Sequence, residues 1–290
     1  MKALVIARLT FREALRKKMI WGVLLLSVCF AVIYYWGFIQ VKDDFLRNTA
    51  NRAARTGSAG NPGPVITLDV VAAILVGLGF YTINFLGGVM TIFAAVGSVA
   101  GEIETGTFQA IVPKPLARWE IILGKYLGFA AMIALYIALM SADVLLTARA
   151  VTGYVPANFA GGTALVVLVS LILLALTILG STLLPTMANG VVVFMLYGMA
   201  LLGGLLEQMG NILLIHSLVV VGIVTSLILP SDVIWQLANN VLQPDIGLRL
   251  SGPIPIAVSQ PPSRAMVYYA VAYVFALLAG AFLAFRRRDL

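Results

Sequence analysis

Charged residues, cysteine and histidine are all scarce in this sequence. Asp, Glu, Lys and Arg make up 11% of the 290 residues, whereas about a quarter of a soluble domain is charged. Hydrophobic residues make up 61%, more than one soluble core can bury, so lipid must solvate much of the surface. The composition therefore excludes an ordinary soluble domain and predicts an all-α membrane protein, with residues 1–290 forming a single transmembrane domain.

The single cysteine and the single histidine exclude two kinds of site. Cys29 has no second cysteine with which to form a disulfide in the chain, and we interpret it as a small apolar core residue. His216 alone cannot build a multi-histidine metal centre, so we predict no metal site and assign this residue no role.

Catalytic motifs are missing as well. Gly124 and Lys125 resemble the end of G-x-x-x-x-G-K-[ST], but Trp119 stands at the first glycine and Tyr126 at the hydroxyl position. We therefore expect that the chain does not hydrolyse nucleotide itself. It also lacks H-E-x-x-H and G-x-S-x-G, and no nucleophile stands with its base, so we predict no catalytic residue.

A basic segment opens the chain at residues 1–18. Arg8, Arg12 and Arg16 are four residues apart, so they line one side of a helix. We predict an interfacial helix that places these arginines on the membrane surface; the alternative is a basic flank that only sets topology. The net charge of +7 does not indicate nucleic acid, because the basic residues stand at the ends of apolar runs, beside anionic head groups.

Six apolar runs are long enough, or nearly so, to cross about 30 Å of hydrocarbon. We predict membrane spans over residues 19–39, 70–100, 123–147, 163–184, 190–206 and 265–285. The connections that we predict between them include a polar external loop over residues 40–68, a short loop over 149–162 and a tight turn over 185–189.

A further apolar run, residues 212–229, leaves the number of spans open. If it crossed the membrane, the chain would have seven spans and the arginines at positions 286–288 would lie outside. With six spans, twelve of the 19 Lys and Arg residues lie on the inner side, which the positive-inside rule favours. We therefore predict an external region over residues 207–264, with a re-entrant hairpin at 212–229 and an irregular cap at 230–264.

Polar side chains inside the spans are few. Asn84 lies near the middle of the second span and is a possible path-lining residue, although a hydrogen bond to a neighbouring helix is the interpretation we favour. Asp143 and Glu207 lie near the predicted membrane–water interfaces, where water can hydrate a charged group, so we assign them no role. The absence of a deep acidic or histidine relay argues against a proton-coupled carrier.

The polar segment with the clearest internal order is residues 101–125. Its features are, in sequence, Glu102 and Glu104, Thr105-Gly106-Thr107, the apolar residues 108–112 starting at Phe108, Pro113 and Pro115, Arg118, and Gly124-Lys125. This segment resembles the cytoplasmic loop after the second span in permeases of the type-2 ATP-binding-cassette (ABC) exporter family. The basic first helix, the six spans and the apolar hairpin before the last span fit the same family.

The resemblance implies a fold, a function and partners. It implies the type-2 ABC exporter fold, in which the loop over residues 101–122 forms a cytoplasmic coupling helix that docks on a separate ATPase subunit. The docking residues implied are Glu102, Glu104, Thr105, Gly106, Thr107, Phe108, Pro113, Pro115 and Arg118. The chain would then be the non-catalytic permease that moves a substrate by ATP hydrolysis on its partner.

The resemblance also sets the expected assembly. We expect two ATPase subunits and a second permease copy, as a homodimer or a related heterodimer, in the lipid bilayer of a prokaryotic cell membrane. Both termini would be cytoplasmic, no cofactor would bind this chain, and ATP and Mg would bind the ATPase. An ATP-independent carrier or channel is the alternative, and a membrane-embedded enzyme or scaffold is a third class that would need a deep polar cluster.

The charges of the 101–125 segment have more than one possible partner. The resemblance implies that Glu102 and Glu104 accept hydrogen bonds from basic groups on the ATPase or on the interfacial helix. Arg118 and Lys125 would pair with these acids or bind lipid phosphates. The alternative is that all these charges only orient the loop.

Overall fold

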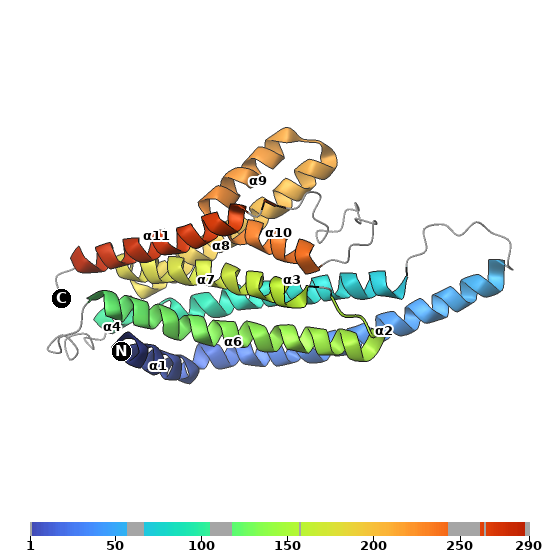
Figure 1. The fold of residues 1–290 in the computed structure, drawn as a ribbon, viewed down its shortest axis with the longest axis horizontal. Helices are drawn as coiled ribbons and strands as arrows, with labels where there is room; N and C mark the ends of the chain where they lie inside the picture. Colours follow the sequence, from blue (N-terminus) through green and yellow to red (C-terminus); the bar gives the residue numbers. More distant parts are fainter. Residues whose placement is uncertain are drawn as a thin grey trace.

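The chain folds into a bundle of long α-helices. A computed structural model describes residues 2–56, 67–104, 118–156, 158–242, 262–263 and 265–287, and these residues contain no strand. The helices are α1 (Lys2–Arg16), α2 (Lys18–Thr56), α3 (Leu68–Ala95), α4 (Ala100–Glu104), α6 (Arg118–Thr152), α7 (Phe159–Leu183), α8 (Thr186–Leu213), α9 (His216–Ile228), α10 (Ser231–Leu242) and α11 (Ala265–Arg287). Figure 1 shows most of them running along one common axis.

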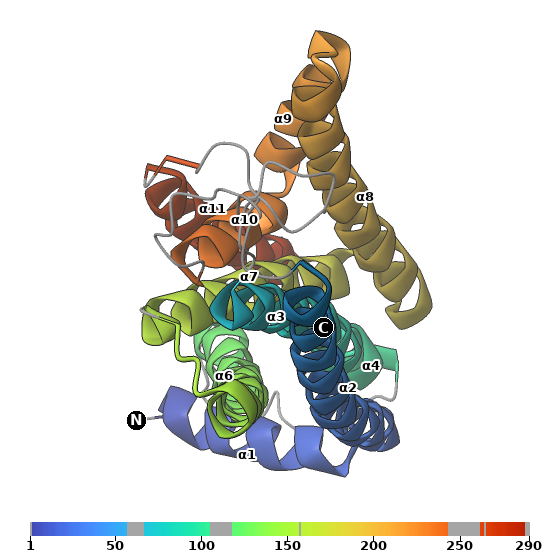
Figure 2. The ribbon, with the colours of Figure 1, turned by 90° about the vertical axis from the view of Figure 1, so that its right-hand side faces the viewer.

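Within the part of the chain that the structure describes, six helical segments are long and apolar enough to cross a membrane, which confirms the predicted all-α membrane fold. They cover Lys18–Asn51, Leu68–Glu104, Trp119–Thr152, Phe159–Leu183, Thr186–Leu213 and Ala265–Arg286. Helix α1 instead runs across the bundle axis: Figure 2 looks along the bundle and shows α1 from the side but α2, α3 and α6 nearly end-on. This orientation suits the interfacial helix that was predicted for residues 1–18.

Two predicted loops are too long, because the helices continue past their apolar parts. Residues 40–56 were predicted as loop but belong to α2, while 57–66 lie outside the described residues. No glycine or proline interrupts the sequence between Gly37 and Gly57, so nothing stops the helix there. Lys42 Nζ also donates to the Val151 carbonyl at 2.7 Å and so ties α2 to the last turn of α6. Helix α6 itself ends at Thr152, inside the loop predicted over 149–162.

Two other segments predicted as irregular contain helix. The predicted turn at 185–189 is shorter, since α8 already begins at Thr186 and Pro185 precedes its first turn, where a missing N–H costs nothing. Residues 231–242 of the predicted irregular cap form α10, whose side chains are mostly buried. Cys29 is exposed rather than in the core, because α2 lies on the outside of the bundle with 17% of its apolar stretch buried.

The segment before the last helix doubles back on itself. Leu214 has a left-handed backbone (φ 57°), after which α9 returns along the end of α8. Helices α9 and α10 then meet at 104°. Figure 1 shows α9 and the adjoining end of α8 standing away from the rest of the bundle. By length and composition this bent pair is either one broken span or a re-entrant hairpin, so the re-entrant interpretation stays a prediction.

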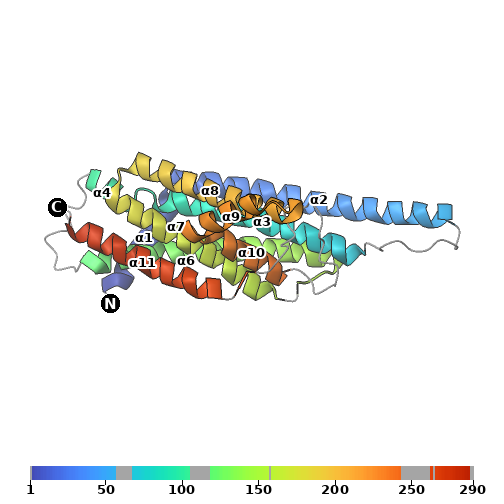
Figure 3. The same cartoon turned by 90° about the horizontal axis from the view of Figure 1, so that it is seen from above.

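The start of α1, the short helix α4 and the end of α11 gather at one end of the bundle (Figures 1 and 3). An even number of spans requires both chain ends on one side of the membrane, and the six-span interpretation fits this arrangement. That the side is the cytoplasmic one rests on the distribution of Lys and Arg.

Candidate functional site

The helix that leads into the ordered polar segment is interrupted just before it. Helix α3 ends at Ala95 and α4 begins at Ala100, with a turn over residues 96–99 between them. We call residues 94–99, the end of α3 and this turn, the elbow. The last carbonyl groups of a helix have no partner within it. The elbow is nevertheless mostly buried, with Ser98 4% and Val99 0% exposed, so its backbone groups need hydrogen bonds from elsewhere.

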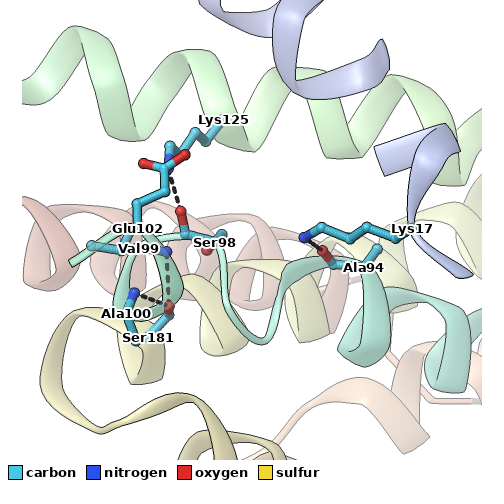
Figure 4. Close-up of polar contacts among 8 residues, drawn as sticks. All are labelled: Lys17, Ala94, Ser98, Val99, Ala100, Glu102, Lys125 and Ser181. Atoms are coloured by element: carbon cyan, nitrogen blue, oxygen red, sulfur yellow. Dashed lines mark hydrogen bonds and ion pairs between the residues drawn. The ribbon is translucent and has the colours of Figure 1, made fainter. Parts of the chain in front are cut away.

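Side chains from three other elements supply donors to the carbonyl oxygens of the elbow. Lys17 Nζ, from the link between α1 and α2, donates to the Ala94 oxygen at 3.0 Å. Asn189 Nδ2, from α8, donates to the Val96 oxygen at 2.8 Å. Lys125 Nζ, from α6, donates to the Ser98 oxygen. Figure 4 shows the two lysines reaching the elbow from different directions.

A serine on α7 accepts from the N–H groups that open α4. Ser181 Oγ lies 3.0 Å from the backbone nitrogens of both Val99 and Ala100 (Figure 4). The first N–H groups of a helix have no partner within it, so this oxygen acts as a cap from a distant part of the chain. Ser181 is fully buried. Donors and acceptors from α6, α7, α8 and the α1–α2 link therefore all hold the elbow.

Lys125 carries a second contact that involves a predicted docking residue. Its ammonium group forms an ion pair with Glu102 of α4 (Figure 4). The Lys125 side chain is 7% exposed and that of Glu102 22%. Removing one partner of such a buried pair leaves the other charge poorly solvated, which is costly. Among the two partners inferred for Lys125 from sequence, the structure shows the acid.

Lys17 lies beside the same network in an apolar setting. Its Nζ stands 5.5 Å from the centre of the Phe129 ring. Burial lowers the pKa of Lys17, and the negative charges of Glu13 and Glu102 oppose that shift. The ammonium group remains useful here because it donates to a backbone carbonyl at the end of α3, where the helix dipole favours positive charge.

The second acid of the segment, Glu104, contacts the beginning of α8. Its Oε1 accepts from the Thr186 backbone N–H at 3.0 Å, and its Oε2 accepts from the Thr186 hydroxyl at 3.2 Å. Pro185, which precedes α8, makes no capping hydrogen bond through its side chain. Glu104 therefore supplies the N-terminal cap that α8 lacks locally, and its charge suits that helix end.

The structure places only part of the predicted docking set. Glu102 and Glu104 are described, and both are bonded within the chain. Thr105, Gly106, Thr107, Phe108, Pro113 and Pro115 lie outside the described residues, and Arg118 begins α6. Docking therefore stays a prediction for the whole set.

The other predicted residues lie apart from the elbow. Arg8, Arg12 and Arg16 are exposed on α1, and their contact with lipid head groups stays a prediction. Asn84 is buried in α3, where its backbone oxygen accepts from the Tyr197 hydroxyl at 3.1 Å. Within the described ranges, no group of three or more His, Cys, Asp or Glu residues is placed to hold a metal ion.

Sequence reasoning missed Ser181 and Asn189. Each is a small polar residue near the end of an apolar run, and such residues are common where spans meet the interface. The sequence offered one indication of their role: both lie at span ends on the same predicted side of the membrane as residues 101–125. Their partners lie 81 to 93 residues away in the sequence, and no local pattern records such a contact.

Comparison with models of protein families identifies the family of this chain. The family model described as "ABC-2 family transporter protein" matches residues 4–290, nearly the full length. No curated protein matches the chain.

Proposed function

We propose that this chain, which belongs to the ABC-2 family of transporter proteins, is the permease of an ABC exporter powered by a separate ATPase subunit. Family membership and the six apolar helices identify a multi-pass membrane component of an ABC transporter. The export direction, the separate ATPase with its ATP and Mg, and an assembly of two permeases with two ATPases are our proposals. So is the placement in a prokaryotic cell membrane with both termini in the cytoplasm.

The elbow is the observation that carries this proposal. A subunit without a nucleotide-binding motif of its own must receive movement from a partner. The elbow leads into residues 101–122, which we propose as the docking segment, and it is bonded to α6, α7, α8 and the α1–α2 link. A rigid displacement of the docking segment would therefore reach several membrane helices at once.

The docked state is tested by crosslinking from within the segment. A photoreactive amino acid replaces Phe108, and a matched one replaces Leu214, which is 90% exposed at the turn between α8 and α9. The chain is co-expressed with ABC ATPase subunits from its own organism, and crosslinked products are identified by mass spectrometry.

We expect a crosslink to the ATPase from position 108 and none from position 214. A complex that co-purifies but crosslinks equally at both positions would contradict docking through this segment. Absence of any ATPase, together with transport by the purified chain alone, would instead favour the ATP-independent carrier.

A further inference from the structure

We propose that Glu104 is a positioning residue that fastens the ATPase-docking segment to α8, so that the docked ATPase moves α8 together with α9. This inference rests on the proposed function. It differs from the prediction made from sequence, in which Glu104 accepts hydrogen bonds from basic groups on the ATPase or on the interfacial helix.

The contact of Glu104 with α8 uses both carboxylate oxygens. One accepts from the backbone N–H of Thr186 and the other from its hydroxyl, at 3.0 and 3.2 Å. The carboxylate thus fixes the first residue of α8 in two directions and fills the cap that Pro185 cannot provide. Only one residue separates Glu104 from Glu102, which is paired with Lys125 of α6. Movement of α4 therefore acts on α6 through Glu102 and on the start of α8 through Glu104.

A second attachment, within the same turn of α8, strengthens this link. Asn189 Nδ2 donates to the Val96 oxygen at 2.8 Å and to the Thr177 oxygen of α7 at 3.1 Å. The side chain fits because position 180 of α7 is glycine: a Cβ there would lie 2.1 Å from Asn189 Oδ1. The start of α8 is thus held on one side by the elbow and on the other by the end of α4.

The far half of α8 is associated with α9 rather than with the elbow. Gly203 and Gly210 lie against Thr225 and Val219 of α9, close enough that a Cβ on either glycine would clash. Figure 2 shows α8 and α9 leaving the bundle as a pair. A displacement at Thr186 therefore travels along a helix of 28 residues to the bent segment before the last span. Helices transmit such rigid-body movements because their backbone bonds resist bending.

The test measures the movement of α8 in the complete complex. In a Cys29→Ser background, spin labels on Leu202 of α8 and Leu139 of α6, both 63% exposed, report their separation by electron paramagnetic resonance. Spectra of the permease–ATPase complex are compared without nucleotide and with ATP plus vanadate. The variants are Glu104→Ala, Glu104→Gln and, as a matched control at the same end of the bundle, the exposed Glu13→Ala.

We expect a nucleotide-dependent distance change in the parent protein and in Glu13→Ala. The change should be lost in Glu104→Ala, although the ATPase still co-purifies, and it should return in Glu104→Gln, because an amide offers an acceptor for the N–H and a donor for the hydroxyl. An undiminished change in Glu104→Ala overturns the inference. So does loss of the ATPase from that variant alone, which would mean that Glu104 docks the partner directly.

If Glu104→Ala does not fold, a second pair of variants tests the link between Glu104 and α8. Thr186→Val removes the hydroxyl but keeps the backbone N–H, and should reduce the distance change, whereas Thr186→Ser should preserve it. Equal changes in both variants contradict the inference. Failure of the parent chain to bind any ATPase is a different result, since it contradicts the proposed function and not the link between Glu104 and α8.

Discussion

At the residue scale, Lys125 is a cation kept in a nearly closed environment by two oxygen acceptors. The residue as a whole is 6% exposed, and its ammonium group contacts both the Ser98 carbonyl and Glu102. A buried charge persists only where hydrogen bonds and an opposite charge compensate for lost hydration. The position is therefore sensitive to the charge of the side chain as well as to its length.

Replacing Lys125 by methionine should destabilise the protein strongly. The apolar side chain fills a similar volume but removes the ammonium group that donates to Glu102 and to the Ser98 oxygen, which we expect to cost about 3 kcal/mol. Thermal unfolding in detergent measures the effect. Adding Glu102→Gln should restore part of the lost stability, because the amide carries no charge. Lys18→Met, at an exposed lysine, is the control. An unfolding temperature unchanged by Lys125→Met would contradict the ion pair.

At the element scale, the packing of α1 on α6 depends on one close approach. Gly128 of α6 lies under α1, where a Cβ would stand 2.5 Å from the Ala7 carbonyl oxygen and 2.9 Å from Thr10 Cβ. The backbone of α1 cannot move aside for an added Cβ as a flexible side chain could. The glycine is therefore what allows α1 to lie against the bundle beside Lys17 and the elbow.

Gly128→Ala should push α1 away from α6 and lower stability by about 1–3 kcal/mol, the usual effect of overpacking. Gly22→Ala is the matched control, since nothing lies within 4 Å of its Cβ position in α2. That change should stabilise the helix by about 0.5–1 kcal/mol, because alanine is the better helix former. Both are measured by thermal unfolding, and shifts of the same sign and size would contradict the close contact.

The existence of each long helix could be predicted from sequence, but its ends could not. Apolarity marks the part of a helix that lipid surrounds, while backbone hydrogen bonds continue through polar residues until glycine, proline or a cap intervenes. Residues 40–56 are the clearest case. The elbow could not be predicted either, because Gly97 and Ser98 lie within an apolar run and the break depends on distant side chains. Glu102 and Glu104 could be selected from sequence, and so could the pairing of Lys125 with one of these acids. The contact of Glu104 with Thr186 at the start of α8 could not.

At the scale of the whole molecule, the two chain ends and α4 share one end of the bundle (Figure 1). The last part of α2, residues 40–56, points toward the opposite end, as the same view shows. Six membrane crossings would produce this arrangement, with the basic residues at the chain ends facing the cytoplasm. Seven crossings would separate the ends.

Cysteine labelling tests this topology. In a Cys29→Ser background, Leu4→Cys and Leu290→Cys should react with an impermeant thiol reagent only after the membrane is opened. Asn48→Cys, on the exposed part of α2, should react in intact cells. Labelling of Leu4→Cys and Leu290→Cys from opposite sides would contradict six crossings.

The central claim is that this permease works through an ATPase on another chain. Native mass spectrometry of the complex, extracted in mild detergent from cells that also express ABC ATPase subunits of the same organism, tests it most directly. We predict an assembly of two copies of this 290-residue chain with two ATPase subunits. The assembly should hydrolyse ATP, and it should lose that activity when the Walker A lysine of the ATPase is replaced. The chain recovered alone, with no nucleotide-binding subunit and with unaided transport, would contradict the claim.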